Sequence, residues 1–127
     1  MLLSVCVLAC LGAASAFLSY QSQIPNGNSV ISPCLIGYWS GVGHLNSHGS
    51  GPLNAFGVDF AAAGHIWTQE LCRADSDRDG KSNGEELGDP NCHFTTAHPS
   101  NLGPATSHPG ICEPVGSAGC AWQGFSC

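Results

Sequence analysis

The clearest periodic pattern of apolar residues in this 127-residue chain lies between positions 59 and 73. Five apolar or small residues recur there at steps of three and four, namely Phe60, Ala63, Gly64, Trp67 and Leu71. This spacing places them on one face of an α-helix, and Asp59 is suited to cap its N-terminus. We therefore predict one main helix over residues 59–73, in which Gly64 costs about 1 kcal/mol relative to alanine.

Outside this helix the alternation of polar and apolar positions is irregular. A turn signal at residues 25–27 predicts a short extended or hairpin-like segment that ends near Cys34, and the glycine-rich stretch 40–52 predicts a loop. Residues 91–127 are rich in glycine, proline, serine and threonine, which is typical of loops and short strands. The predicted fold class is a small disulfide-rich α+β domain, with one main helix, short strands and long loops.

The first 16 residues form a segment of a different kind. They are almost entirely apolar and end on the small residues Ala14, Ser15 and Ala16, as the core and cleavage site of a secretory signal peptide do. We expect cleavage after Ala16 and a secreted, extracellular product. A retained membrane anchor is the alternative, but the run is short for a membrane span, and no later segment is apolar enough for one.

Composition adds that this domain needs covalent or metal support. The chain contains 17 glycines and 8 prolines, so folding loses much backbone entropy for a modest apolar core. Six cysteines follow the signal peptide: Cys34, Cys72, Cys92, Cys112, Cys120 and Cys127. An even number of cysteines in an oxidising compartment predicts three disulfides. Zinc ligation is the alternative, but the chain has no CxxC pair.

Acidic charge is concentrated in one stretch of the chain. The formal net charge is −6, which disfavours nucleic acid and anionic membrane surfaces, so neither is expected as a partner. Six of the nine carboxylates lie between residues 75 and 89, and the three basic side chains, Arg73, Arg78 and Lys81, stand beside them. This clustering indicates a cation site.

Residues 75–86 match the calcium-loop pattern D-x-[DN]-x-[DN]-G-x5-E along its whole length. Calcium takes about six to eight oxygen ligands. The pattern assigns them to the carboxylates of Asp75, Asp77, Asp79 and Glu86, the backbone carbonyl of Lys81, and a water held by Asn83. The chain has no second such loop, so we expect one structural calcium ion rather than a calcium sensor. A solvated acidic turn without a specific ion is the alternative.

Histidines are the other candidates for metal chemistry. His44, His65 and His108 are the candidates for a second metal site among the six histidines. Zinc or copper needs three or four converging donors, and a surface or hydrogen-bonding role is the alternative for each of these residues. The sequence has neither a GxSxG nor a HExxH motif. We assign no catalytic residue and do not expect an enzyme.

Five longer stretches carry a family resemblance: QSQIPNG at 21–27, GVGH at 41–44, GPLNAFGVDFAAAGHIWTQELC at 51–72, DSDRDGKSNGEELGDPNC at 75–92 and SHPGIC at 107–112. Together they resemble the temptins, the water-borne protein pheromones of gastropod molluscs. The resemblance implies a temptin-like domain over residues 17–112. It also implies a secreted attractant that acts with companion peptides of the attractin type and a chemosensory receptor.

Two other functions remain open at this stage. One is a structural extracellular calcium-binding module. The other is a histidine-metal enzyme, because domains related to the temptins also occur fused to copper monooxygenase modules.

Sequence position suggests one set of disulfide pairs among the fifteen that six cysteines allow. We predict a Cys72–Cys92 bridge, because these residues flank the acidic loop. A Cys34–Cys112 bridge would then join the ends of the family region. Cys120 and Cys127 would form a local clasp within residues 113–127, an extension whose role the resemblance leaves open.

Overall fold

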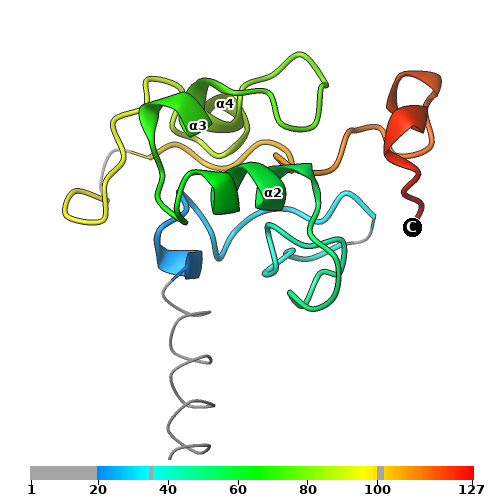
Figure 1. Cartoon of the computed structure of the whole chain (residues 1–127), viewed down its shortest axis with the longest axis horizontal. Coiled ribbons are helices and arrows are strands. Elements are labelled where there is room, and N and C mark those ends of the chain that lie inside the picture. Colours follow the sequence, from blue (N-terminus) through cyan, green and yellow to red (C-terminus); the bar gives the residue numbers. More distant parts are fainter. Residues whose placement is uncertain (1–19, 35, 100–101) are drawn as a thin grey trace, which may run out of the picture.

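A computed structural model describes residues 20–34, 36–99 and 102–127. The predicted signal peptide, residues 1–16, lies outside the described residues. The regular elements that lie wholly within these residues are α2 (Ala55–Ala62), α3 (Gln69–Arg73), α4 (Asn83–Glu86) and the 3-10 helix η1 (Ala118–Gln123). In Figure 1 the three α-helices lie together, while the C-terminal segment with η1 extends to one side of them.

The predicted short strands are almost absent. In the described part of the chain, β-structure is limited to two isolated bridges, Ile31 with Tyr38 and His44 with Leu53. The glycine-rich loop shows why: a Cβ on Gly41 would overlap the backbone of Gly49, so this loop doubles back through close backbone contact instead of extending into a ladder. The disulfide-rich character agrees with the prediction, but the strand part of the α+β class is corrected to short helices and loops.

The predicted helix over residues 59–73 begins earlier than its apolar stripe suggested. α2 starts at Ala55, because the side chain of Asn54 accepts a hydrogen bond from the N–H of Gly57 (2.9 Å). Asn54 is therefore the N-cap. Asp59 lies inside α2, where its carboxylate accepts a hydrogen bond from the hydroxyl of Ser76 (2.7 Å).

The same predicted helix is also interrupted, which makes it two helices instead of one. Gly64 and His65 have φ angles of +75° and +59°, and left-handed residues of this kind terminate a helix. α3 then begins anew after Thr68, whose side chain accepts from the N–H of Leu71 (3.1 Å). Gly64 is thus a helix stop and not a tolerated interior glycine.

The core lies between α2 and the segments packed against it. It consists of seven buried apolar residues: Ile24, Val30, Val42, Phe56, Phe60, Leu71 and Leu87. The rings of Phe56 and Phe60 stack at 5.8 Å on the inner side of α2, and Trp67 packs against this cluster from the turn between α2 and α3. α2 therefore contributes the aromatic centre of the domain.

The disulfide between Cys72 and Cys92 is present, in agreement with the predicted pairing. It joins the last turns of α3 to the segment that follows α4. Because these two cysteines lie on either side of the acidic loop, the bridge fixes the two ends of that loop relative to each other.

The other two disulfides differ from the prediction. Cys112 pairs with Cys120, and Cys34 pairs with Cys127, so the predicted Cys34–Cys112 bridge and the Cys120–Cys127 clasp are not formed. The side-chain amide of Gln123 bonds both the N–H and the carbonyl of Cys112 (2.8 and 3.0 Å). These bonds hold η1 beside Cys112, which brings Cys120 within reach and directs the C-terminus towards Cys34.

Within the described residues, no helix has the length and hydrophobicity that crossing a membrane requires.

Candidate metal centre

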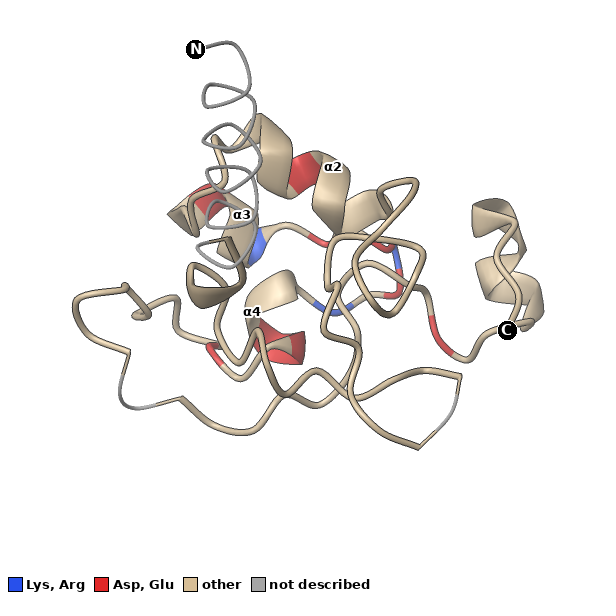
Figure 2. Ribbon diagram, turned by 90° about the horizontal axis from the view of Figure 1, so that it is seen from below, with Lys and Arg blue, Asp and Glu red and all other residues tan. Residues whose placement is uncertain are grey.

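The acidic loop is held at both ends by local hydrogen bonds. Ser82 and Glu85 form a capping box at the start of α4, in which each side chain bonds the other residue's backbone N–H (3.1 and 3.3 Å). The N–H of Asn83 donates to the carbonyl of Ala74 (2.7 Å) across the base of the loop. In Figure 2 the ribbon of the α3–α4 connection and of α4 carries acidic residues (red), with basic residues (blue) close by.

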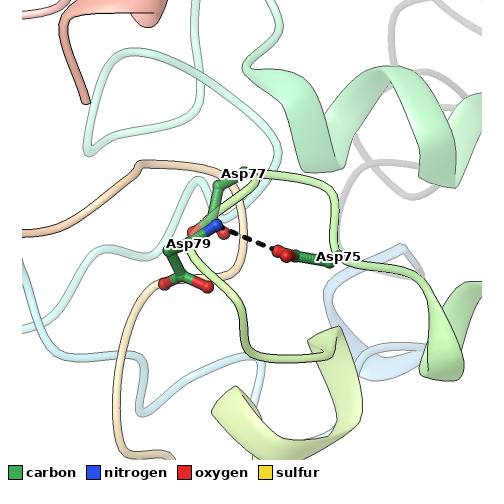
Figure 3. A group of neighbouring side chains, drawn as sticks. All are labelled: Asp75, Asp77 and Asp79. Atoms are coloured by element: carbon green, nitrogen blue, oxygen red, sulfur yellow. Dashed lines mark hydrogen bonds between the residues drawn. The ribbon is translucent and has the colours of Figure 1, made fainter. Parts of the chain in front are cut away.

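Three aspartates converge inside the loop. One carboxylate oxygen from each of Asp75, Asp77 and Asp79 lies within 4.8 Å of the other two, and Figure 3 shows their side chains gathered at one point. Asp75 accepts hydrogen bonds from the N–H groups of Asp79 (3.2 Å) and Gly80 (2.8 Å), so the backbone curls around it. Gly80 has a φ of +91°, which allows the sharp turn that the sixth position of a calcium loop needs.

Asp77 is the buried member of this group. Its side chain is fully buried, and neither of its carboxylate oxygens has a hydrogen-bond partner. Burial, with the nearby carboxylates of Asp79 and Asp75, raises the pKa of Asp77 from 3.8 to about 9. A buried carboxylate without partners costs free energy, and a cation in contact with it would offset that cost.

Glu86 brings a fourth carboxylate to the group from the end of α4. It is fully buried; its Oε1 accepts from the hydroxyl of Ser107 (2.9 Å), and its Oε2 has no partner. Burial, with Asp79 and Asp77 beside it, raises the pKa of Glu86 to about 10. The site thus offers several carboxylate oxygens and no nitrogen or sulfur donor, a set that suits a hard cation.

Asn83 has a different role from the predicted one. Its buried amide donates to the carbonyl of Leu71 (2.8 Å) and to the hydroxyl of Ser76 (2.9 Å), and its oxygen accepts from the N–H of Ser76 (3.4 Å). The amide therefore fastens the loop to α3 instead of facing the aspartates. Lys81 is exposed, and its N–H donates to Asp79 (2.9 Å); a ligand role for its carbonyl stays a prediction.

Sequence reasoning missed two contacts that the C-terminal third makes with this loop. One is the hydrogen bond from Ser107 to Glu86. The other places the guanidinium of Arg78 at 4.8 Å from the ring centroid of Trp122 in η1. A cleft of about 750 Å³ lies beside the loop, and Glu113 is among the residues that line it. The partners are far apart in the sequence, so no local pattern could have indicated these contacts.

The three candidate histidines do not form a metal site. Among the described residues, the group that brings three potential ligand atoms within 4.8 Å is the aspartate group, and it includes no histidine. His44 and His65 line an apolar pocket beside α2. His108 is fully buried elsewhere, with its ring edge-on to Trp39 at a centroid distance of 5.4 Å. The predicted second metal site at His44, His65 and His108 is corrected accordingly.

Comparison with known proteins identifies the family. The chain matches the family described as Temptin C-terminal over residues 14–111. It is 52% identical over 101 residues to the protein named Temptin from Aplysia californica, which covers 79% of this chain and 81% of that protein. No solved structure was found to match. Because the family match and the identity both extend over most of the chain, the chain belongs to the temptin family.

Proposed function

We propose that this protein is a secreted, water-borne pheromone that attracts conspecifics together with companion peptides of the attractin type, through a chemosensory receptor. The observation that carries the proposal is the 52% identity to Aplysia temptin over 81% of that protein. At this level of identity over about four-fifths of both chains, a shared biological role is the simplest inference. It also accounts for a disulfide-rich chain that starts with a predicted signal peptide.

The physical properties of the chain suit such a role. A net charge of −6 keeps a protein dissolved, and three disulfides oppose unfolding outside the body. These properties are common to secreted proteins.

A behavioural assay tests this proposal directly. Pure recombinant protein, companion peptides, and a mixture of the two are released into water in a choice arena with animals of the source species. The mixture should attract more animals than the peptides alone, and reduced and alkylated protein should add nothing to the peptides. If the folded protein adds no attraction in any mixture, the pheromone proposal fails.

We further propose that the loop at residues 75–86 holds one calcium ion that stabilises the fold. The support is structural: three converging aspartates, and three unpartnered oxygens on the buried Asp77 and Glu86. Asp75, Asp77, Asp79 and Glu86 would hold the ion, with the carbonyl of Lys81 as a further ligand. Extracellular calcium sites have dissociation constants of about 10⁻⁴ to 10⁻³ M, and calcium at about 100-fold above the constant adds about 2.7 kcal/mol to the unfolding free energy.

The Asp77→Asn variant tests calcium binding, because it keeps the size of the side chain and removes a ligand charge. Wild-type protein should melt at a higher temperature in calcium than in chelator. Asp77→Asn should melt at the same temperature in both. In chelator at neutral pH it should be at least as stable as wild type, because the raised pKa of Asp77 costs the wild type free energy on folding and asparagine carries no such cost. Exposed Glu70 in α3 provides the matched control, and Glu70→Gln should retain the full calcium response.

Asn83→Ala distinguishes residues that support the loop from residues that bind the ion. Because the Asn83 amide fastens the loop to α3, its loss should lower the unfolding free energy by about 1–3 kcal/mol. This loss should appear both in calcium and in chelator, and the stabilisation by calcium should persist. A wild-type melting temperature that does not depend on calcium would contradict the calcium proposal and leave the pheromone proposal untouched.

A structural extracellular calcium module is the second candidate function, and the buried carboxylate group favours it. It predicts calcium-dependent stability without any attraction in the behavioural assay. The histidine-metal enzyme has less support, since His44, His65 and His108 do not converge. Stoichiometric copper or zinc in the purified protein, together with no attraction, would return the enzyme to consideration.

A further inference from the structure

We infer that a pocket beside α2 binds one small, uncharged, largely apolar molecule, so that this protein carries an apolar compound in water in addition to its proposed signalling role. The pocket, called the α2 pocket below, has a volume of about 370 Å³. Ligand pockets usually measure about 300–1,000 Å³, so the α2 pocket accommodates a molecule at the small end of this range.

Three segments that are distant in sequence form the walls of the α2 pocket. Tyr20 and Ile24 come from the N-terminal segment, Val42 comes from the glycine-rich loop, and Phe60 comes from α2. In Figure 1 the N-terminal segment and the glycine-rich loop both lie below α2. Ile24, Val42 and Phe60 also belong to the buried core, so the floor of the pocket is continuous with the core and is already held in place.

Glycines create the room in this pocket. Gly43 and Gly57 both line it, and the loop and α2 approach so closely there that a Cβ on Gly57 would overlap the carbonyl of Gly43. Gly51 also lines the pocket, and a Cβ on Gly51 would meet no atom within 4 Å. The backbone is thus packed tightly at Gly43 and Gly57, whereas space remains open beside Gly51. The surface between them is therefore concave.

The lining residues specify the chemistry of the ligand. They include no Asp, Glu, Lys or Arg, although the chain carries twelve such residues, nine acidic and three basic. A charged ligand would lose its hydration without gaining a counter-ion, so the ligand must be uncharged. The polar side chains that line the pocket are those of Gln21, Ser40, His44 and Ser50, together with the hydroxyl of Tyr20 and the imidazole of His65. A few such groups suffice to orient one hydroxyl or carbonyl group on an otherwise apolar molecule.

An aromatic shelf forms one side of the pocket. The ring of Tyr20 stacks on the imidazole of His65 at a centroid distance of 4.1 Å, and Phe60 meets both rings edge-on. His65 has a φ of +59°, which is uncommon for a residue other than glycine. The chain accepts this conformation where the helix stops, and it places the imidazole at the pocket. Flat rings at the wall favour an aromatic or unsaturated ligand.

The experiment uses N-phenyl-1-naphthylamine, an uncharged probe whose fluorescence rises in apolar surroundings, with the full secreted protein. We expect saturable binding of one probe per chain. Leu53 lines the pocket and is 44% exposed, whereas Val58 on α2 is 56% exposed and does not line it. Leu53→Arg should raise the dissociation constant by about tenfold or more, because it places a charge in an apolar wall. Val58→Arg should change it by less than about twofold.

Backbone amide spectra locate the bound probe. The N–H signals of Gly41, Gly43, Gly49, Gly51 and Gly57 should shift during titration, and those of Gly116, Gly119 and Gly124 should not. Absence of saturable binding, equal affinity in both arginine variants, or shifts at the C-terminal glycines would overturn the inference. Two further outcomes would overturn it by assigning the pocket to protein. One is tighter probe binding after Phe17→Ser, which would mean that the segment following the predicted cleavage point competes with the probe. The other is a dimer in solution that Leu53→Arg dissociates.

Discussion

His108 shows how burial determines the role of a single polar residue. Its Nδ1 accepts a hydrogen bond from the N–H of Gly110 (3.0 Å), so the ring proton lies on Nε2, which has no hydrogen-bond partner. The ring packs edge-on against Trp39 at 5.4 Å. Burial lowers the pKa of His108 from 6.5 to about 3. The side chain is therefore packed as a neutral aromatic ring.

The lowered pKa predicts a specific dependence of stability on pH. Between pH 6.5 and about 3 the unfolded chain binds a proton at His108 and the folded chain does not. The unfolding free energy should therefore fall as pH decreases through this window, by about 1.4 kcal/mol per pH unit from this residue alone. Denaturant titrations of wild type and His108→Gln at several pH values isolate this contribution as their difference.

The matched control for this prediction is His98, which is exposed. His98→Gln should track wild type at every pH. Burial raises the pKa of Glu113, which accepts from the N–H of His108 (2.8 Å); both proteins retain Glu113, so its contribution cancels in their difference. A difference between wild type and His108→Gln that stays constant with pH would contradict the lowered pKa of His108 in the folded protein.

At the scale of elements, the packing of α2 against the glycine-rich loop is the critical contact. Gly57 lies inside α2 and is buried. Its α-carbon lies so close to the backbone of Gly43 that a methyl group on Gly57 would overlap the Gly43 carbonyl. Asn54 adds hydrogen bonds to the carbonyls of Val42 (2.7 Å) and His44 (2.9 Å). One residue thus caps the helix and holds the loop, so helix and loop are positioned together.

Gly57→Ala should destabilise the protein although alanine favours helices. The intrinsic gain in helix propensity is about 1 kcal/mol. The new methyl group meets a backbone carbonyl that cannot rotate away, and overpacking of this kind costs about 1–3 kcal/mol or more. We expect a net loss in unfolding free energy, measured by urea denaturation. Gly119→Ala in η1 is the control, because a Cβ there meets nothing within 4 Å; equal stability of the two variants would contradict the predicted contact.

At the scale of the whole molecule, disulfides attach the C-terminal segment, residues 113–127, to the rest of the domain. The Cys34–Cys127 disulfide spans 93 residues, whereas the Cys112–Cys120 disulfide spans 8. The first joins the segment around Cys34 to Cys127, and the second holds η1 beside Cys112. Contacts from Ser107 and Trp122 to the acidic loop connect this region to the rest of the domain. Residues 113–127 are therefore an integral part of the fold and not an independent extension.

The two bridges should differ in their contribution to stability. In the chain-entropy account, the Cys34–Cys127 loop contributes about 4.7 kcal/mol and the Cys112–Cys120 loop about 2.6 kcal/mol. Replacing the first pair by alanines should lower the unfolding free energy more than replacing the second. Peptide mapping without reduction should recover these two pairs and Cys72–Cys92. Recovery of Cys34 linked to Cys112 would contradict this connectivity.

The sequence by itself determined the features that contiguous residues encode. The positions of the four loop carboxylates, Asp75, Asp77, Asp79 and Glu86, followed from their spacing, and the family followed from five stretches of sequence. The Cys72–Cys92 bridge was also predictable, because both cysteines flank one loop. Local sequence is informative for these features because ligand spacing and loop closure depend on a short length of chain.

Only the tertiary structure decided the features that depend on residues far apart in sequence. The apolar stripe at 59–73 did not reveal that Gly64 and His65 take left-handed conformations, because the His65 ring is held by Tyr20 and Phe60. Spacing predicted that Asn83 holds a calcium-bound water, but its amide donates to the carbonyl of Leu71 and the hydroxyl of Ser76. The remaining disulfides and the α2 pocket likewise form between segments that come together only when the chain folds. The order of residue types along the chain does not specify which distant segments make contact.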